Sequence, residues 1–311
     1  MSLDKESTEL FSSTASGPPL QELSPAAARQ FELTGPRGIS PEVASSRDQE
    51  IPSADGTALT VRIITPGPSS LGVIVFFHGG GWVLGSLEEY EPLCRELANR
   101  SGCSVVMVDY RLAPESQFPA AVDDSWCATR WVSENLAIIA EPDSAIYIAG
   151  DSAGGNLAAV IAQRAAMTGE VTIARQILIY PITDSDLNRP SYLAPENQRL
   201  LTRELMKWFW AHYAPEDWQR RDVRSVPLHG ALFQLDPIPH LSPAIVVSCT
   251  YDVLIDEIDA YVSKLQAAGI PVTRRHYEDQ MHGFITLVNV LPGAIDAVEF
   301  IADCLRSGEG K

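Results

Sequence analysis

The chain has 311 residues, 45% of them hydrophobic and 20% charged, which is enough to bury one large core or two smaller ones. Its net charge of −17 argues against nucleic acid or an anionic membrane as a partner, because both bind to positive patches. No apolar run approaches the length of a membrane span and the N-terminus shows no signal-peptide pattern, so we expect a cytoplasmic protein without membrane contact.

In chain order, an irregular N-terminal part is followed by alternating strand and helix patterns. Residues 1–45 are rich in Ser, Pro, Ala and Gln, with a helical pattern at 25–33 and no strong strand. Short, mostly apolar runs then predict strands at 59–64, 73–77, 104–108, 145–149, 176–180, 244–248 and 272–277. Amphipathic stretches predict helices at 87–99, 120–136, 156–167, 255–268 and 294–305. Such alternation predicts an α/β fold, with a mostly parallel sheet flanked by helices.

The alternation is interrupted at residues 185–241, which we interpret as an insertion over the carboxyl edge of the sheet, where ligands bind in open α/β folds. The insertion holds a predicted helix at 202–213 and then an irregular stretch dense in proline. The aromatic residues of that helix either pack in the interior or line an apolar acyl pocket. Both interpretations are open for Trp208, Phe209, Trp210 and Tyr213.

A Gly-x-Ser-x-Gly motif, Gly150-Asp151-Ser152-Ala153-Gly154, lies between the predicted strand at 145–149 and a helix-forming stretch. This setting forces the serine into a tight turn, in which a Cβ at either flanking glycine would clash with the neighbouring backbone. The turn exposes the Ser152 hydroxyl at the carboxyl edge of the sheet, above a helix N-terminus. The motif therefore predicts a serine nucleophile.

A serine hydroxyl needs a base, and in this architecture a histidine follows the serine and the acid along the chain. Among the candidates, His276 lies within a predicted strand, whereas His282 lies in the loop directly after it, next to a glycine. A loop histidine at the carboxyl end of a strand can reach the nucleophile, so we expect His282 to be the base. The candidates that follow Ser152 are His212, His229, His240, His276 and His282.

The acid that orients the histidine should also follow a buried strand. Asp252 comes directly after the apolar run 244–251 and is our candidate. Asp256 and Glu257 are nearby alternatives, but they stand at the start of the predicted helix at 255–268. Carboxylates there stabilise the helix dipole, which is a structural role.

The sequence His78-Gly79-Gly80-Gly81-Trp82 follows the predicted strand at 73–77. Contiguous glycines let backbone N–H groups turn toward a substrate oxygen, as an oxyanion hole requires, and the amide of Ala153 would add to it. A phosphate-binding loop is the alternative, but neither a Gly-Lys-Ser/Thr ending nor a spaced Gly-x-Gly-x-x-Gly pattern is present.

The cysteines are odd in number and scattered, and they form no Cys-x-x-Cys pair. We expect buried reduced thiols rather than a disulfide framework or a zinc site. The five residues are Cys94, Cys103, Cys127, Cys249 and Cys304.

Taken together, these motifs resemble those of the hormone-sensitive-lipase-like esterases, bacterial family IV of the α/β-hydrolase superfamily. The resemblance covers the chain from about residue 50 to its end. The matching segments are His-Gly-Gly-Gly-Trp at 78–82, Asp-Tyr-Arg-Leu-Ala-Pro-Glu at 109–115 with Phe-Pro-Ala-Ala at 118–121, Gly-Asp-Ser-Ala-Gly-Gly-Asn at 150–156, Tyr-Pro at 180–181, Asp252 with 256–257, and His-Gly-Phe at 282–284.

The resemblance implies a catalytic triad of Ser152, Asp252 and His282. It implies a core at 46–184 and 242–311, covered by a helical cap built from 1–45 and 185–241. Dimers through the last strand and helix are also implied. The oxyanion donors would be the amides of Gly80, Gly81 and Ala153, and the expected substrate contacts are Trp82, Tyr180, Trp208, Phe209 and Phe284.

We therefore expect a carboxylic ester hydrolase that acts on short- to medium-chain acyl esters through an acyl-enzyme, without a metal or organic cofactor. An amidase or peptidase on the same fold is one alternative. Such an enzyme would have to protonate its amine leaving group more strongly than an esterase protonates an alcohol. A non-catalytic receptor for small ligands on a hydrolase scaffold is another.

Overall fold

The computed structural model describes residues 2–14, 17–32, 40–235 and 239–307. The predicted cap segments 1–45 and 185–241 are therefore described only in part, and Leu33, the last residue of the predicted N-terminal helix, lies outside the described residues.

The described strands form one eight-stranded sheet in the order β1-β2-β4-β3-β5-β6-β7-β8. Strand β2 pairs antiparallel with β1 on one side and with β4 on the other, and all other neighbours pair parallel. The predicted α/β fold with a mostly parallel sheet is confirmed. The bounds are β1 Ser45–Pro52, β2 Ala58–Thr65, β3 Gly72–Phe77, β4 Ser104–Val108, β5 Ala145–Asp151, β6 Arg175–Ile179, β7 Ala244–Tyr251 and β8 Val272–Met281.

The strand that the sequence did not predict is β1. It pairs with β2 along its whole length, yet nearly all of its side chains are exposed, and four of its eight residues are Arg47, Asp48, Gln49 and Glu50. A polar strand at the edge of a sheet lacks the apolar run or strict alternation by which strands are predicted.

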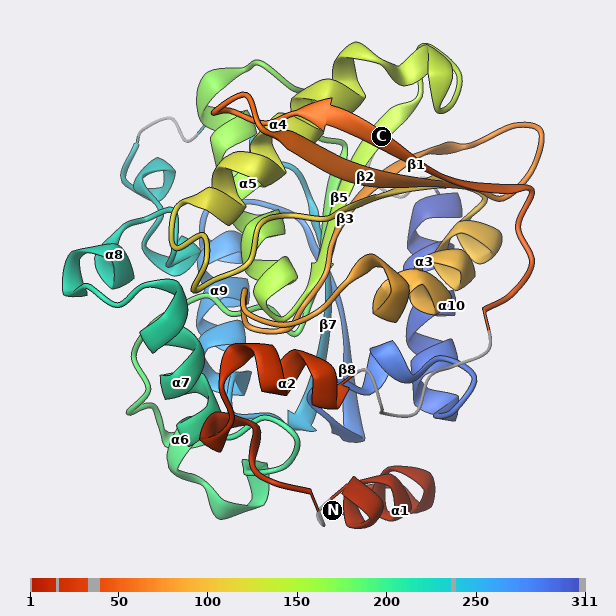
Figure 1. Ribbon diagram of the computed structural model, residues 1–311. Coiled ribbons are helices and arrows are strands. Elements are labelled where there is room, and N and C mark those ends of the chain that lie inside the picture. Colours follow the sequence, from red (N-terminus) through yellow and green to blue (C-terminus); the bar gives the residue numbers. More distant parts are fainter. Residues whose placement is uncertain (1, 15–16, 33–39, 236–238, 308–311) are drawn as a thin grey trace.

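Five long helices cover the two faces of the sheet. One face carries α3 (Leu87–Ser101) and α10 (Pro292–Arg306), which contact each other, and the other carries α4 (Ala120–Glu134), α5 (Ala153–Thr168) and α9 (Ile255–Ala267) (Figure 1). The strands between them are apolar, and all six side chains of β3 are buried. The core therefore consists of two helix–sheet layers on a shared sheet.

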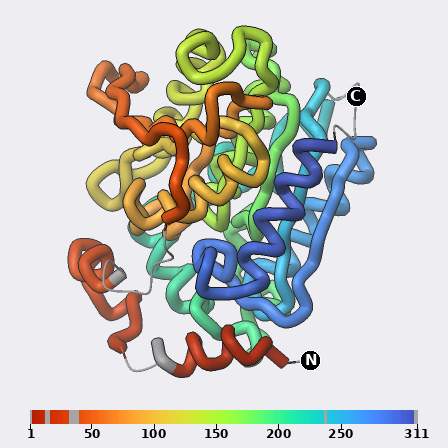
Figure 2. The backbone as a smooth tube through the Cα atoms, turned by 90° about the vertical axis from the view of Figure 1, so that its right-hand side faces the viewer, coloured from red at the N-terminus to blue at the C-terminus, as the bar shows by residue number. Residues whose placement is uncertain are grey.

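The shorter helices gather at the end of the sheet toward which the parallel strands point, as Figures 1 and 2 show. The N-terminal segment and the insertion are in contact there: the 3₁₀ turn Leu20–Glu22 packs against α7. Their bounds are α1 Lys5–Thr14, α2 Pro25–Glu32, α6 Pro190–Leu193, α7 Arg203–Tyr213 and α8 Asp217–Arg221. The other 3₁₀ turns are Leu136–Ile138, Pro195–Asn197, Pro227–His229, Ala231–Gln234 and Phe284–Leu287.

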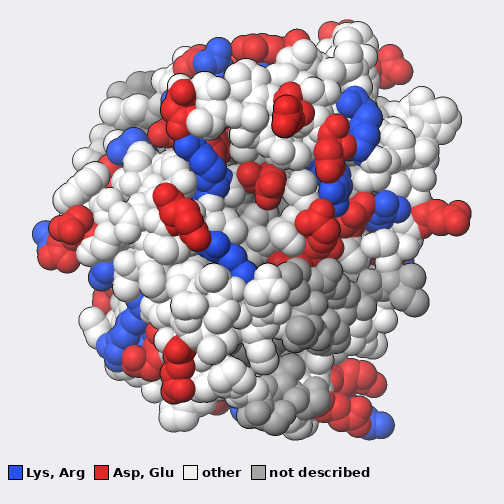
Figure 3. Space-filling view, in the orientation of Figure 1, with Lys and Arg blue, Asp and Glu red and all other residues white. Residues whose placement is uncertain are grey.

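Charged residues of both signs alternate over the face in Figure 3, where acidic side chains stand beside arginines and lysines and no continuous basic area forms. Within the described ranges, a helix with the length and apolar character of a membrane span is absent. The five cysteines are free thiols: Cys94, Cys103 and Cys249 are buried, whereas Cys127 and Cys304 are only partly so.

Candidate active site

Ser152 stands at the sharp turn between β5 and α5. Its backbone has φ 54° and ψ −115°, a combination that L-residues rarely adopt and that is found at strained functional turns. A Cβ at Gly150 would collide with the carbonyl of Gly154, and a Cβ at Gly154 would collide with the carbonyl of Phe77. The two glycines of the motif are therefore required by the close approach of strand, turn and helix, as predicted.

The turn is held by backbone hydrogen bonds on both sides of Ser152. Its amide donates to the carbonyl of Ile179 at 2.9 Å, and its carbonyl accepts from the amides of Asn156 at 3.0 Å and Ile182 at 3.1 Å. The side-chain amide of Asn156 donates in turn to the carbonyls of Ile182 and Ser225. The strained conformation is thus fixed by β6, by α5 and by the insertion.

The three side chains expected to form the triad lie in hydrogen-bonding contact. His282 Nε2 is 2.9 Å from Ser152 Oγ, and His282 Nδ1 is 2.9 Å from Asp252 Oδ2. The other carboxylate oxygen of Asp252 accepts the amide of Leu254 at 2.9 Å. Asp252 is fully enclosed, while Ser152 and His282 are each 7% exposed.

The last two strands bring the acid and the histidine together. Asp252 follows β7 and His282 follows β8, and these parallel strands pair Tyr251 with Met281. The amide of His282 also donates to the carbonyl of Tyr251 at 3.2 Å. Adjacent parallel strands that end at the same edge deliver both side chains to one place, above the carboxyl edge of the sheet.

The other candidate histidines lie elsewhere. His276 points from β8 to the hydroxyls of Ser248 and Thr250, each 3.0 Å away, and His229 contacts Asp184. His212 packs against Trp208 in α7, and His240 lies in the irregular stretch before β7. None of these four, all within the described residues, is hydrogen-bonded to Ser152.

The two alternative acids hold the insertion. Asp256 accepts the amide of Ser191 at 2.8 Å. Glu257 is fully buried and accepts the amides of Thr183 at 2.8 Å and Asp184 at 3.3 Å, together with the hydroxyl of Tyr192 at 3.2 Å. Burial raises the pKa of Glu257 to about 8. Their structural role agrees with the prediction, although the partners belong to another loop rather than to the start of α9 alone.

The glycine loop after β3 adopts conformations that suit glycine. Gly80 has φ 95° and Gly81 has φ 60°, and the turn is closed by the amides of Val83 and Leu84, which donate to the carbonyl of Gly80. Among the described residues, no group accepts a hydrogen bond from the amides of Gly80 and Gly81. This pair of N–H groups is therefore free to bind an oxygen of a ligand.

His78 supports the loop from below. The hydroxyl of Tyr110 donates to the His78 carbonyl at 2.8 Å, and the two rings stack with centroids 4.3 Å apart. Burial lowers the pKa of His78 to about 4, so its ring is neutral at physiological pH. His78 therefore acts through packing rather than through charge.

The expected substrate contacts divide into two groups. Phe209 of α7 lies against Gly81, where a Cβ would overlap its ring, and Trp208 packs edge-on to Phe209. The ring of Tyr180 is 4.5 Å from that of His282. Phe284 is fully enclosed behind Tyr180 and Tyr277, and Trp82 is fully enclosed as well, stacked on Tyr213 at 4.2 Å. Trp82 and Phe284 therefore pack in the interior of this structure, as does the equally enclosed Tyr180, and their contact with substrate stays a prediction.

Arg29 is a contact that the sequence did not reveal. From α2 its guanidinium donates to the carbonyls of Val83 at 2.7 Å and Ala113 at 2.8 Å, and it forms a bidentate pair with Glu115. It thereby ties the N-terminal segment to the loop that follows the glycines. A single arginine in a short helix carries no motif that could have marked it.

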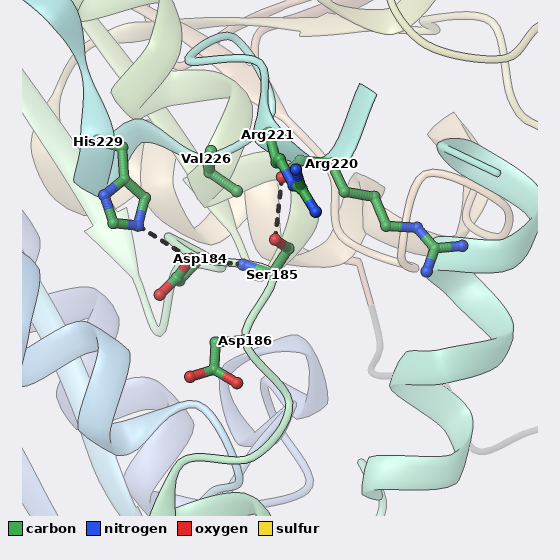
Figure 4. Close-up of a pocket in the computed structure, with 7 residues that line it drawn as sticks. All are labelled: Asp184, Ser185, Asp186, Arg220, Arg221, Val226 and His229. Atoms are coloured by element: carbon green, nitrogen blue, oxygen red, sulfur yellow. Dashed lines mark hydrogen bonds and ion pairs between the residues drawn. The ribbon is translucent and has the colours of Figure 1, made fainter. Parts of the chain in front are cut away.

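A separate pocket of about 310 Å³ opens between the start of the insertion and α8 (Figure 4). The ring of His229 points toward Asp184 there, and Ser185 donates its hydroxyl to the carbonyl of Arg220. The residues that line it are Asp184, Ser185, Asp186, Arg220, Arg221, Val226 and His229, and none belongs to the expected triad. Within the described ranges, no group of three or more His, Cys, Asp or Glu side chains is arranged to hold a metal ion.

The chain is similar to known proteins along most of its length. Residues 74–286 match the family model described as alpha/beta hydrolase fold. The carboxylesterase NlhH of Mycobacterium tuberculosis is 38% identical over 275 residues, which are 88% of this chain and 85% of that protein. The ethyl acetate hydrolase of Pseudomonas putida is 32% identical over 289 residues, covering 90% and 89% of the two chains.

Solved structures show the same relationship. A thermostable esterase from Pseudomonas putida ECU1011 superposes with a TM-score of 0.89 at 31% identity, over 98% of this chain and 97% of that one. A hyperthermophilic esterase from the archaeon Pyrobaculum calidifontis gives a TM-score of 0.86 at 34% identity, over 99% of both chains. The chain therefore belongs to the α/β-hydrolase superfamily, among its hormone-sensitive-lipase-like carboxylesterases.

Proposed function

We propose that this ester hydrolase works through Ser152, His282 and Asp252 and an acyl-enzyme intermediate. The hydrogen-bonded chain from Asp252 to His282 to Ser152 carries the proposal. His282 Nε2 accepts the proton of Ser152 Oγ as the hydroxyl attacks the ester carbonyl, and the same nitrogen then protonates the leaving alcohol. In the second half of the reaction, His282 takes a proton from a water molecule, which attacks the carbonyl of the acyl-enzyme and releases the acid.

Asp252 orients the imidazole in this scheme. Its carboxylate accepts a hydrogen bond from the Nδ1–H group of His282, which leaves Nε2 as the proton acceptor, and it stabilises the imidazolium that forms. Because Asp252 is fully enclosed and held by the amide of Leu254, its position changes little during the reaction.

The oxyanion is assigned to the amides of Gly80, Gly81 and Ala153. The first two lie on the loop beside the nucleophile, and Ala153 is the first residue of α5, where N–H groups lack intrahelical partners. Preorganised donors of this kind stabilise the charge that develops on the carbonyl oxygen in the transition state.

We assign residues 1–45 and 185–241 to a cap and favour short- to medium-chain acyl groups. Helix α7 supports both assignments, because Phe209 lies directly on the glycine loop and leaves Ser152 and His282 little exposed. A relative named for ethyl acetate, an ester with a two-carbon acyl group, agrees with a small acyl site.

Two further assignments concern the assembly and the alternatives. A homodimer through β8 and α10 is supported by the position of β8 at the edge of the sheet.

An amidase would use the same side chains as an esterase, so the rates on paired ester and anilide substrates distinguish amidase from esterase activity. A receptor without catalysis is disfavoured by the intact hydrogen bonds of all three side chains.

Hydrolysis of p-nitrophenyl esters from acetate to palmitate tests the proposal. The wild-type protein should cleave the short esters fastest, and Ser152→Ala should abolish turnover while Ser69→Ala, at an exposed serine, leaves it unchanged. Turnover by Ser152→Ala at the wild-type rate would remove Ser152 from the nucleophile role. A rate that rises steadily to palmitate would overturn the assignment of acyl length.

A further inference from the structure

Asp151 is a buried carboxyl that the mechanism above does not use. It is the last residue of β5, directly before Ser152, and pairs with Ile179 of β6. Only 2% of its surface is exposed, and its Oδ1 has no hydrogen-bond partner within the described part of the chain. Burying an incompletely paired carboxyl is costly, which points to a role that an apolar residue could not fill.

The second oxygen of this carboxyl faces the glycine loop. Asp151 Oδ2 accepts the hydroxyl of Tyr90, from α3, at 3.2 Å, and the backbone amide of Gly79 also stabilises the charged form. The approach is close: a Cβ at Gly79 would lie 2.5 Å from Oδ2 and 2.7 Å from the Tyr90 hydroxyl oxygen. Through this carboxyl, Asp151, which precedes the nucleophile, contacts Gly79, which precedes Gly80.

We propose that Asp151 is a positioning residue whose ionised carboxylate holds Gly79 and Tyr90, and thereby places the amides of Gly80 and Gly81 relative to Ser152 Oγ. The inference rests on the proposed function, in which these amides bind the oxyanion. A carboxylate is a strong acceptor for both donors, whereas the protonated acid is a weaker acceptor and itself needs one. Loss of the Asp151 proton therefore favours the ordered loop.

The ionisation of Asp151 falls within the working range of such an enzyme. Burial raises the pKa of Asp151 to about 7, while the charge of protonated His282 and the hydrogen bonds from Tyr90 and Gly79 lower it. A proton on His282 and a negative charge on Asp151 thus stabilise each other.

Four other titratable groups around Asp151 stay neutral near pH 7. Burial lowers the pKa of His78 to about 4, so its ring is uncharged. Burial, followed by the charge on Asp151 itself, raises the pKa of one thiol and two phenols well above their usual range. These groups are Cys94 of α3, Tyr110 after β4 and Tyr180 after β6. Of these buried groups, Asp151 is therefore the one that changes its charge near neutral pH.

The pH dependence of kcat/KM for p-nitrophenyl butyrate tests the inference. In the wild-type enzyme both Asp151 and His282 must lose a proton, so log(kcat/KM) should rise on the acid side with a slope that approaches 2. Asp151→Asn keeps the size and one acceptor oxygen but does not titrate, and its slope should be 1. Its kcat should also fall by about 10²-fold with little change in KM, as expected for a misplaced catalytic loop.

Two further variants complete the test. Tyr90→Phe removes a hydrogen bond that favours the charged carboxylate, so the second ionisation should move to higher pH while the slope stays near 2. Asp143→Asn, at an exposed aspartate, should leave the profile unchanged. Circular dichroism and thermal unfolding of each variant show that it is folded at the assay temperature.

The outcomes separate this inference from the proposed function. If Ser152→Ala is inactive while Asp151→Asn keeps the wild-type kcat and pH profile, the role of Asp151 is refuted and the triad stands. If Ser152→Ala remains active, the proposed function fails first. An unmoved second ionisation in Tyr90→Phe would also contradict the inference.

Discussion

The ring of Phe209 lies directly against Gly81, so that a methyl group at Gly81 would overlap it. The contact joins α7, from the insertion, to the loop that holds the expected oxyanion donors. Phe209 is only 5% exposed, and its ring also contacts that of Trp208 edge-on. The ring of Phe209 therefore covers Gly81, which makes the size of this side chain a direct test of substrate size.

Replacing Phe209 with alanine should shift the preference of the enzyme toward longer acyl chains. Removal of the ring opens space next to Gly81, and the ratio of kcat/KM for octanoate to that for acetate should rise. The change should also lower the free energy of unfolding by about 3–5 kcal/mol, the usual effect of Phe→Ala in a core. Phe209→Leu is the matched control and should give a smaller shift. An unchanged ratio would contradict the placement of the acyl group under α7.

Gly81→Ala should abolish most of the activity for two separable reasons. The positive φ of Gly81, 60°, costs an L-residue about 1–2 kcal/mol, and the new Cβ collides with Phe209. The double variant Gly81→Ala with Phe209→Ala removes only the collision and should recover part of kcat. A double-mutant cycle on kcat/KM measures this coupling, and strictly additive effects would show that the two residues do not interact.

Asp252→Asn should lower kcat by about 10⁴-fold with a smaller effect on KM. An amide cannot stabilise the imidazolium and favours the wrong tautomer of His282, and the comparable substitution in a serine protease has an effect of that size. Asp256→Asn, four residues further on, is the control, because Asp256 binds the amide of Ser191 instead. A loss of activity in Asp256→Asn that exceeds the loss in Asp252→Asn would reverse the assignment of the acid.

Glu257 should make the folded protein less stable as the pH rises. Its pKa is raised to about 8, mainly by burial, whereas the unfolded carboxyl has its ordinary value of 4.5. Between these values the folded state keeps a proton that the unfolded state has lost, so the free energy of unfolding falls as the pH increases and levels off above about 8.

Glu257→Gln removes this dependence, because the amide oxygen can still accept the amides of Thr183 and Asp184. The difference in stability between Glu257→Gln and the wild type should grow from about pH 5 to about pH 8, by an amount on the order of a few kcal/mol. Urea unfolding at both pH values measures it. A difference that is independent of pH would show that Glu257 is ionised in the folded protein throughout.

Most of the fold and the candidate triad could be predicted because the sequence marks them locally. Ser152 is flanked by glycines between an apolar run and a helix, and Asp252 and His282 each follow a strand directly. When parallel strands end at one edge, residues at those positions meet even though 130 positions separate Ser152 from His282. A local pattern and a topological rule are therefore enough.

What could not be predicted depends on contacts between distant segments. Arg29 reaches the carbonyl of Val83 only because α2 folds back onto the glycine loop. The ring of Trp82 stacks on Tyr213, a residue of the insertion that is more than a hundred positions away in the sequence. Strand β1 was not predicted because most of its residues are polar. An edge strand forms by pairing with a single neighbour and does not need a buried apolar face.

The attachment of α1 has a practical consequence for how this protein is produced. Asp4 and Ser7 bind both ends of the side-chain amide of Gln280, two residues before His282, and the backbone of Asp4 donates to Asp279 at 3.1 Å. A shortened version that begins after this helix would lose these contacts with the residues just before the base. Kinetic constants from such material would describe a modified enzyme, even though every residue of the triad is intact.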